Sequence, residues 1–181
     1  AVVLDGELLL HSGGTVPTGQ ANGGTRTFQN IFFNNRFWVS DDGEHWASIT
    51  NVNGNEATDE GIVLDGHFVL QEGSVIPGSG FTSPVRNNGF FGGFMDASGN
   101  WYARGKNGDD VAWLVRNGDV IAREGDPIVP GSTELISGRI FTASFGLVTG
   151  NSLGQCVYVA ETDEADPGRD EVAVRDGLRI V

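Results

Sequence analysis

The sequence predicts an all-β protein built from tandem copies of a four-stranded antiparallel unit. Three observations support this fold class. A hairpin motif recurs at Gly6, Gly66, Gly118 and Gly177, with a period of roughly 50 to 60 residues. A second turn motif, between the hairpins, keeps a similar period. No segment shows a sustained helical period, and 28 glycines also disfavour helices.

The first motif is a hairpin with a two-residue turn. It reads LDGELLL, LDGHFVL, RNGDVIA and RDGLRIV, in which Asp-Gly or Asn-Gly separates two apolar runs. Such pairs favour a type I′ turn, because this turn needs a positive φ at both central residues. A proline follows the first three copies, at Pro17, Pro77 and Pro130, and is expected to end the second strand. Each copy therefore supplies two strands, here named A and B.

The second motif is another strand–turn–strand element. It reads SDDGEHWAS, DASGNWYAR and NSLGQCVYV, with its turn glycines at 43, 99 and 154. Tight turns flanked by alternating runs predict two further strands, here named C and D. The chain order is then A–B followed three times by C–D–A–B. Repeat landmarks lie near 4–60, 64–110 and 114–171, and the terminal 172–181 is read as a surplus half-repeat in a single domain, 1–181.

Three and a half copies of a four-stranded unit favour a β-propeller-like repeat. Each unit matches a propeller blade, but closed propellers have at least four blades. The chain is then part of a longer propeller, a subunit that shares blades with others, or an open array with one hairpin to spare. An unpaired hairpin edge is a template for strands of another chain. The alternative fold is a β-trefoil, a closed body of three four-stranded repeats.

Aromatic residues concentrate on the predicted strands. Alternation places about half of them in the core, and Trp38 and Trp101 are the candidates to face a ligand. Trp46, Trp101 and Tyr158 stand at three different offsets from their turn glycines, which predicts opposite sheet faces for some of them. The strand aromatics are Phe32, Phe33, Phe37, Trp38, Trp46, Phe90, Phe91, Phe94, Trp101, Tyr102, Trp113, Phe141, Phe145 and Tyr158.

The composition of the chain limits the classes of partner and of covalent cross-link that can be expected. The formal net charge of −13 makes nucleic acid a poor partner, because the chain cannot neutralise phosphates. No apolar run approaches the roughly 20 residues that cross a membrane as a helix. The single cysteine, Cys156, excludes an intrachain disulfide and is expected to be a buried strand residue.

The acidic loops between strands D and A are the candidate metal sites. They read NVNGNEATDEG (51–61), GKNGDD (105–110) and TDEADPGRDE (162–171). Several carboxylate and amide oxygens in one turn-rich loop match the needs of Ca²⁺. The third loop is the most charged, so Asp163, Asp166, Asp170 and Glu171 are the calcium candidates, and a solvated acidic loop is the alternative.

The segment VRNGDVIAREGDPIVPG followed by NSLGQCVYVAE resembles bacterial cell-surface tandem-repeat proteins with an Asn-x-x-Gly-x-x-Ala-Phe signature. Gly125-Asp126-Pro127 and Pro130-Gly131 match their Gly-Asp-Pro-x-Pro-Gly stretch, and Asn151 with Gly154 matches the start of the signature. The Ala-Phe positions differ, since this chain has Val157-Tyr158 there. The resemblance implies an exported, surface-associated, propeller-like protein and carries over no catalytic residue.

The function expected from the sequence is a non-enzymatic extracellular or cell-surface module, structural or adhesive, that self-associates through sheet edges into a ring or fibre. Its partner would be a copy of itself. A glycan-binding propeller is the first alternative, and a propeller hydrolase or lyase using the acidic loops is the second. No phosphate-binding loop, HExxH or CxxC is present, and His11, His45 and His67 fall at different phases of the repeat, so no enzymatic activity is expected.

Overall fold

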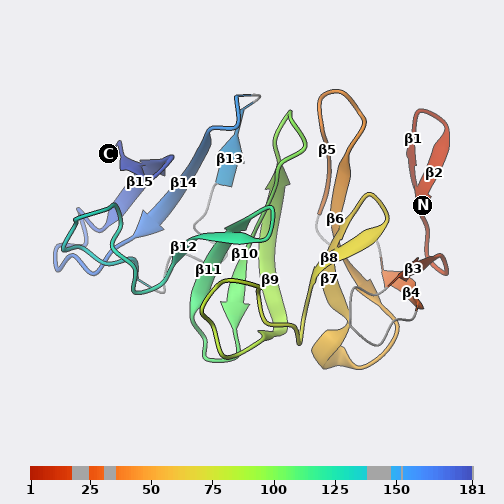
Figure 1. Ribbon diagram of the computed structural model, residues 1–181, viewed down its shortest axis with the longest axis horizontal. Helices are drawn as coiled ribbons and strands as arrows, with labels where there is room; N and C mark the ends of the chain where they lie inside the picture. Colours follow the sequence, from red (N-terminus) through yellow and green to blue (C-terminus); the bar gives the residue numbers. More distant parts are fainter. Residues whose placement is uncertain (18–24, 31–35, 138–147, 152, 181) are drawn as a thin grey trace.

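The chain forms a row of four antiparallel sheets, as the computed structural model shows in Figure 1. The structure describes residues 1–17, 25–30, 36–137, 148–151 and 153–180. The predicted strand aromatics Phe32, Phe33, Phe141 and Phe145 lie outside these residues. The strands are β1 (Val2–Leu4), β2 (Glu7–Leu10), β3 (Thr15–Pro17), β4 (Thr25–Asn30), β5 (Phe37–Val39), β6 (Trp46–Val52), β7 (Glu60–Leu64), β8 (His67–Gln71), β9 (Val85–Met95), β10 (Trp101–Asn107), β11 (Ala112–Arg116), β12 (Asp119–Arg123), β13 (Val148–Gly150), β14 (Cys156–Glu161), β15 (Glu171–Arg175) and β16 (Leu178–Arg179).

The predicted four-stranded antiparallel unit is confirmed, and the strands of each complete sheet follow one another in the chain order C–D–A–B. The third sheet has the order β9–β10–β11–β12 and the fourth has β13–β14–β15–β16. The second sheet contains β5–β6–β7–β8 in the same pairing and adds β4 beside β6 and β3 beside β4. Its D–A loop includes a single 3₁₀ turn, η1 (Glu56–Thr58). No helix among the described residues is long and apolar enough to cross a bilayer.

The position of the surplus hairpin differs from the prediction. The terminal hairpin, β15–β16, is not left over, because β15 pairs with β14 along five residues and completes the fourth sheet. The hairpin without C and D strands is β1–β2 at the other end of the row, which forms a sheet of two strands. The predicted landmarks 4–60 and 64–110 group each A–B hairpin with the C–D element that follows it, whereas each sheet joins C–D to the next A–B, so the incomplete copy is the first.

The A–B turns adopt the predicted conformation. Both central residues have positive φ in all four copies: 48° and 86° at Asp5-Gly6, 48° and 83° at Asp65-Gly66, 51° and 92° at Asn117-Gly118, and 50° and 77° at Asp176-Gly177. This is the backbone of a type I′ turn, whose twist matches that of the flanking strands.

The hydrophobic core lies between consecutive sheets. Because successive strand residues point to opposite faces, each internal sheet contributes to two core layers. For example, Trp113 and Val115 of β11 face the second sheet, whereas Ala112 and Leu114 face the fourth. The layer between the hairpin and the second sheet contains Leu10, Trp46, Val52, Val63 and Phe68.

A β-bulge recurs on strand B. In β2, β8 and β12 one residue is skipped in the ladder with strand A, namely Leu9, Val69 and Ile121. Each is the third residue after the turn glycine. A bulge twists a strand and interrupts its regular hydrogen bonding, so it makes the outer edge a poor template for another strand.

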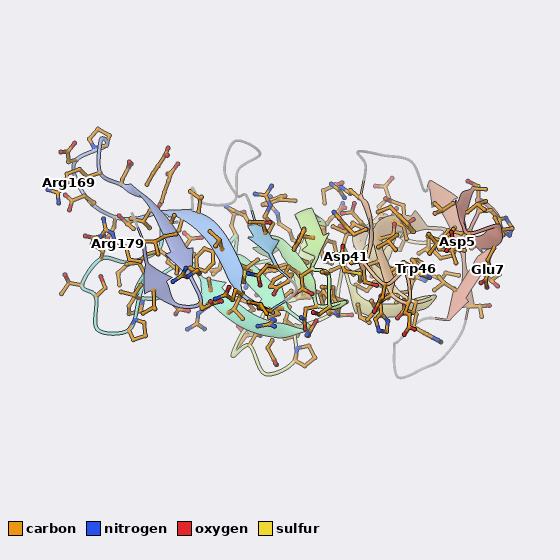
Figure 2. All side chains as sticks on the ribbon, turned by 90° about the horizontal axis from the view of Figure 1, so that it is seen from above. Asp5, Glu7, Asp41, Trp46, Arg169 and Arg179 are labelled. Atoms are coloured by element: carbon orange, nitrogen blue, oxygen red, sulfur yellow. The ribbon has the colours of Figure 1, made fainter. Side chains whose placement is uncertain are left out.

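The row is open. Figure 1 shows the two ends of the chain at opposite ends of the row, and Figure 2, from above, places Asp5 and Glu7 at one end and Arg169 and Arg179 at the other. The sheets therefore stack without closing into a ring. The β-trefoil alternative, a closed body, does not describe this arrangement of the described residues.

Candidate functional site

The outer face of the first hairpin is the first candidate surface. Val3 and Leu8 lie opposite each other in the β1–β2 ladder and are 59 % and 53 % exposed. Val3 stands two residues before the turn residue Asp5, and the equivalent positions of the other repeats are Val63, Val115 and Val174. Those three valines are 0 % exposed. One residue type thus occupies the same position four times, and only the copy at the end of the row is uncovered.

The open edge of β1 is part of the same surface. In the complete units the turn residue before the glycine holds strand D at two points. Asp65 Oδ1 accepts the Trp46 N–H (2.8 Å), and the Asp65 N–H donates to the Trp46 carbonyl (3.0 Å). Asn117 makes the same pair with Trp101, and Asp176 with Cys156. Within the described residues β1 pairs with β2 alone, so Asp5 has no strand D to hold.

The outer face of the fourth sheet is the second candidate surface. Tyr158, Ala160, Val172 and Val174 point to the third sheet, so their neighbours Val157, Val159 and Ala173 point away from it. All three are half-buried. Their equivalents on the internal sheets are covered: Ala47 and Tyr102 correspond to Val157, and Ile62 and Leu114 to Ala173, and all four are buried. Leu178, on the same side, is 62 % exposed.

Only two of the four predicted calcium residues line the same groove. Asp163 and Asp170 line an acidic groove between the third and fourth sheets, whereas Asp166 and Glu171 do not. Asp163 accepts the Leu135 N–H (2.7 Å), and Asp166 accepts the Gly168 N–H within its own turn (2.9 Å). The other acidic residues of the groove are Asp109, Asp110, Glu124, Glu161 and Glu164, with Lys106 beside them.

This groove does not yet identify a metal centre. Among the residues that the structure describes, no group of three His, Cys, Asp or Glu side chains is arranged to hold an ion. Calcium therefore stays a prediction for Asp163, Asp166, Asp170 and Glu171. Calorimetry with millimolar Ca²⁺ is its direct test.

An aromatic cleft crosses the row at the ends of strands C. It is lined by Phe37 and Trp38 of β5, by Phe94 of β9 and by Asn151 after β13. Trp38 lines this cleft, and its contact with a ligand stays a prediction. The same prediction for Trp101 is wrong, because that side chain is 5 % exposed and packs between the second and third sheets.

The prediction that some repeat aromatics lie on opposite faces is also wrong. Trp46 and Trp101 are equivalent, since each N–H binds the turn residue of its own A–B hairpin. The offset arises because the C–D turn is one residue longer in the second sheet, where Ser40 bonds to His45, than in the third, where Asp96 bonds to Asn100. Trp46, Trp101 and Tyr158 all face the preceding sheet.

A buried carboxylate that the sequence reading overlooked joins two sheets. Glu72 is 0 % exposed, and it accepts the Glu60 N–H of β7 and the Gly89 N–H of β9, both at 3.2 Å. Burial raises the pKa of Glu72 to about 7. The signal was present as a Glu-Gly pair after strand B, at Glu72-Gly73 and Glu124-Gly125. Glu124 likewise accepts the Ala112 N–H of β11, strand A of its own sheet (3.0 Å).

Comparisons with models of protein families, with curated proteins and with solved structures gave no match. The resemblance to cell-surface tandem-repeat proteins therefore stays a prediction.

Proposed function

We propose that this chain is a non-enzymatic structural or adhesive module of the cell exterior that assembles with copies of itself. The observation that carries the proposal is the valine series. Val63, Val115 and Val174 are fully buried by neighbouring strands and sheets, whereas Val3 is 59 % exposed in the same role. The β1–β2 hairpin, at the end of the row, therefore exposes a residue that the other repeats bury.

The energetics favour covering these surfaces. Complete burial of a valine or leucine contributes about 1.5–3 kcal/mol, so Val3 and Leu8, each about half exposed, leave roughly 1 kcal/mol apiece unrealised. The uncovered side of the fourth sheet adds Val157, Val159 and Ala173. Repeat arrays gain stability from each neighbour that covers a face, which gives such a module a reason to associate.

Charge opposes this association at low salt. Copies with a formal charge of −13 repel one another, and salt screens that repulsion within a Debye length of about 10 Å at 0.1 M. We expect the mean mass in solution to rise with protein concentration and with added NaCl. Sedimentation velocity across both variables tests the proposal, and a monomer under all conditions would contradict it.

A glycan-binding role is the second candidate, and the aromatic cleft favours it. Trp38, Phe37 and Phe94 offer rings for a sugar face, and Asp41 and Asn151 offer hydrogen-bonding groups at the same cleft. Binding of an oligosaccharide there should change the tryptophan fluorescence. The change should be lost in Trp38→Ala and kept in Trp101→Phe, whose side chain lies in the core.

A further inference from the structure

We infer that copies of this chain stack head to tail, with the outer face of the fourth sheet of one copy packed on the outer face of the β1–β2 hairpin of the next. The inference rests on the proposed self-association and names its two surfaces. In this inference the copies associate through sheet faces, rather than through the sheet edges expected from the sequence.

The internal junctions show what each face accepts. Every sheet has a forward side, toward the fourth sheet, and a backward side, toward the first hairpin. At the junction of the second and third sheets, the forward side contributes Ala47, Ile49 and Ile62, and the backward side contributes Trp101 and Trp113. The other two junctions join sides in the same sense. A forward side is thus always covered by a backward side.

The described row leaves one side of each kind uncovered. The uncovered backward side belongs to the hairpin and carries Val3 and Leu8. The uncovered forward side belongs to the fourth sheet and carries Val157, Val159 and Ala173. A second copy can therefore place its backward side on the forward side of the first copy, as in every internal junction. This is a heterologous contact, which continues into rings or filaments rather than stopping at a dimer.

The edges are less suited to this task. Strand B is the outer strand of the hairpin and of the second and third sheets, and there the bulges at Leu9, Val69 and Ile121 interrupt its ladder. On the other side, the hairpin and the fourth sheet end in β1 and β13, which have three residues each, and the third sheet ends in β9, whose ladder with β10 shifts register twice. Short and bulged edges are features that limit strand addition.

The size of the contact sets the concentration that the test requires. The hairpin limits the contact, because its two strands, about 4.8 Å apart and of three and four residues at about 3.4 Å each, present a projected area of about 130 Å². Stable complexes bury about 800 Å² per partner. A single junction is therefore weak, and association should be measured up to about 1 mM.

The experiment uses one aspartate on each face. Val3→Asp places a charge on the backward side, and Ala173→Asp places one on the forward side, both at positions that water reaches in the free chain. Each variant alone should associate at least about tenfold more weakly than the wild type, because the charge would be buried without a partner. Mixed in equal amounts they should form dimers but nothing larger, since each retains the face that the other lacks.

Ile121→Asp is the matched control, because Ile121 is 39 % exposed on a bulged edge and away from both end faces. It should associate like the wild type, and circular dichroism should show all three variants folded. A wild-type monomer at about 1 mM would overturn both this inference and the proposed function. A wild type that associates while Val3→Asp or Ala173→Asp alone associates equally well, or while Ile121→Asp fails, would overturn only the face-to-face stacking.

Discussion

At the scale of single residues, the residue before each turn glycine does two tasks. It accepts positive φ, and in the complete units its side chain holds the first N–H of strand D. Asp5 does only the first, because no strand D lies beside β1 in the part of the chain that the structure describes. Asp5 is therefore an internal control for the hydrogen bond to strand D.

We predict that Asp65→Ala destabilises the fold by about 2–4 kcal/mol, from left-handed backbone strain and the lost hydrogen bond to the buried Trp46 N–H. Asp5→Ala should cost about 1 kcal/mol or less, because it loses only the conformational preference. Asp65→Asn should be close to wild type, since Asn117 does the same task in the third sheet. Urea denaturation midpoints measure the series, and equal losses at Asp5 and Asp65 would refute the role assigned to the side chain.

Glu72 makes stability depend on pH. Its pKa is raised from about 4.5 to about 7 because burial penalises the carboxylate, and Glu60 and Asp59 nearby add to the shift. Since the folded pKa is the higher one, the stability that protonated Glu72 contributes is fully present below about pH 4.5 and is lost as the pH rises through 7.

We expect Glu72→Gln to remove roughly 3 kcal/mol of pH-dependent change in unfolding free energy between pH 4.5 and 7.5. The other carboxylates still titrate in the variant, so the informative quantity is the difference between the wild-type and variant slopes. Denaturation curves at four pH values across this range give that difference. Identical slopes would show that Glu72 is not the group responsible.

At the scale of strands, close backbone approach explains why some glycines lie in the middle of a ladder. A Cβ on Gly105 of β10 would stand 2.0 Å from the Gly89 carbonyl oxygen and 2.6 Å from Trp113 Cζ2. Trp113 is 0 % exposed, so its ring has no room to move away.

Gly105→Ala should therefore destabilise the protein by at least about 3 kcal/mol, because overpacking here involves backbone and a fixed ring. Gly108→Ala is the control three residues later, where the nearest contact of a Cβ would be an ordinary 3.4 Å to Ser83 Cβ. It should change the stability by no more than about 0.5 kcal/mol. Thermal unfolding of the two variants compares them directly.

The elements show which parts of the fold can be predicted from sequence. Both hairpins of the repeat were predictable, because Asp-Gly turns, alternation and glycine spacing are local signals. The pairing of D with A was not, since this backbone ladder joins strands that an acidic loop separates, and the sequence reading had no two-residue turn to specify it. Without that pairing, the sequence indicates 172–181 as the surplus hairpin, whereas the structure shows that the hairpin without C and D strands is β1–β2.

The candidate surfaces were less predictable than the strands. The acidic loop at 162–171 was visible as composition, but only the fold shows that Asp163 and Asp170 face a groove whereas Asp166 caps its own turn. Val3 could not be identified from the sequence, because the sequence alone does not show whether a valine is exposed or buried. Its significance comes from comparing four equivalent positions in the structure.

At the scale of the whole molecule, the row of sheets behaves as a nearly one-dimensional stack. Among the described residues, each core layer is shared by two neighbouring sheets, so the stability of a sheet depends on how many of its sides are covered. The third sheet is covered on both sides, and Trp113 and Leu114 of β11 are fully buried on opposite faces. The first hairpin has two strands and one covered side.

We therefore predict graded amide hydrogen exchange along the row. Amides of β10 and β11 should exchange slowest, those of the fourth sheet faster, and those of β1 and β2 fastest, because local opening costs least where the fewest apolar contacts are lost. Mass spectrometry of peptic peptides resolves these segments. Uniform protection would mean that the row unfolds as one cooperative unit and that the end hairpin is not weakly held.

The same measurement distinguishes a hairpin that is weak by nature from one that lacks a neighbour. If copies stack through the hairpin, raising the protein concentration covers Val3 and Leu8, and exchange in β1 and β2 should slow while exchange in β10 and β11 stays the same. Val3→Asp should abolish this dependence on concentration, whereas Ile121→Asp should keep it. Protection that rises equally in all sheets would point instead to nonspecific aggregation, which has no reason to favour one end of the row.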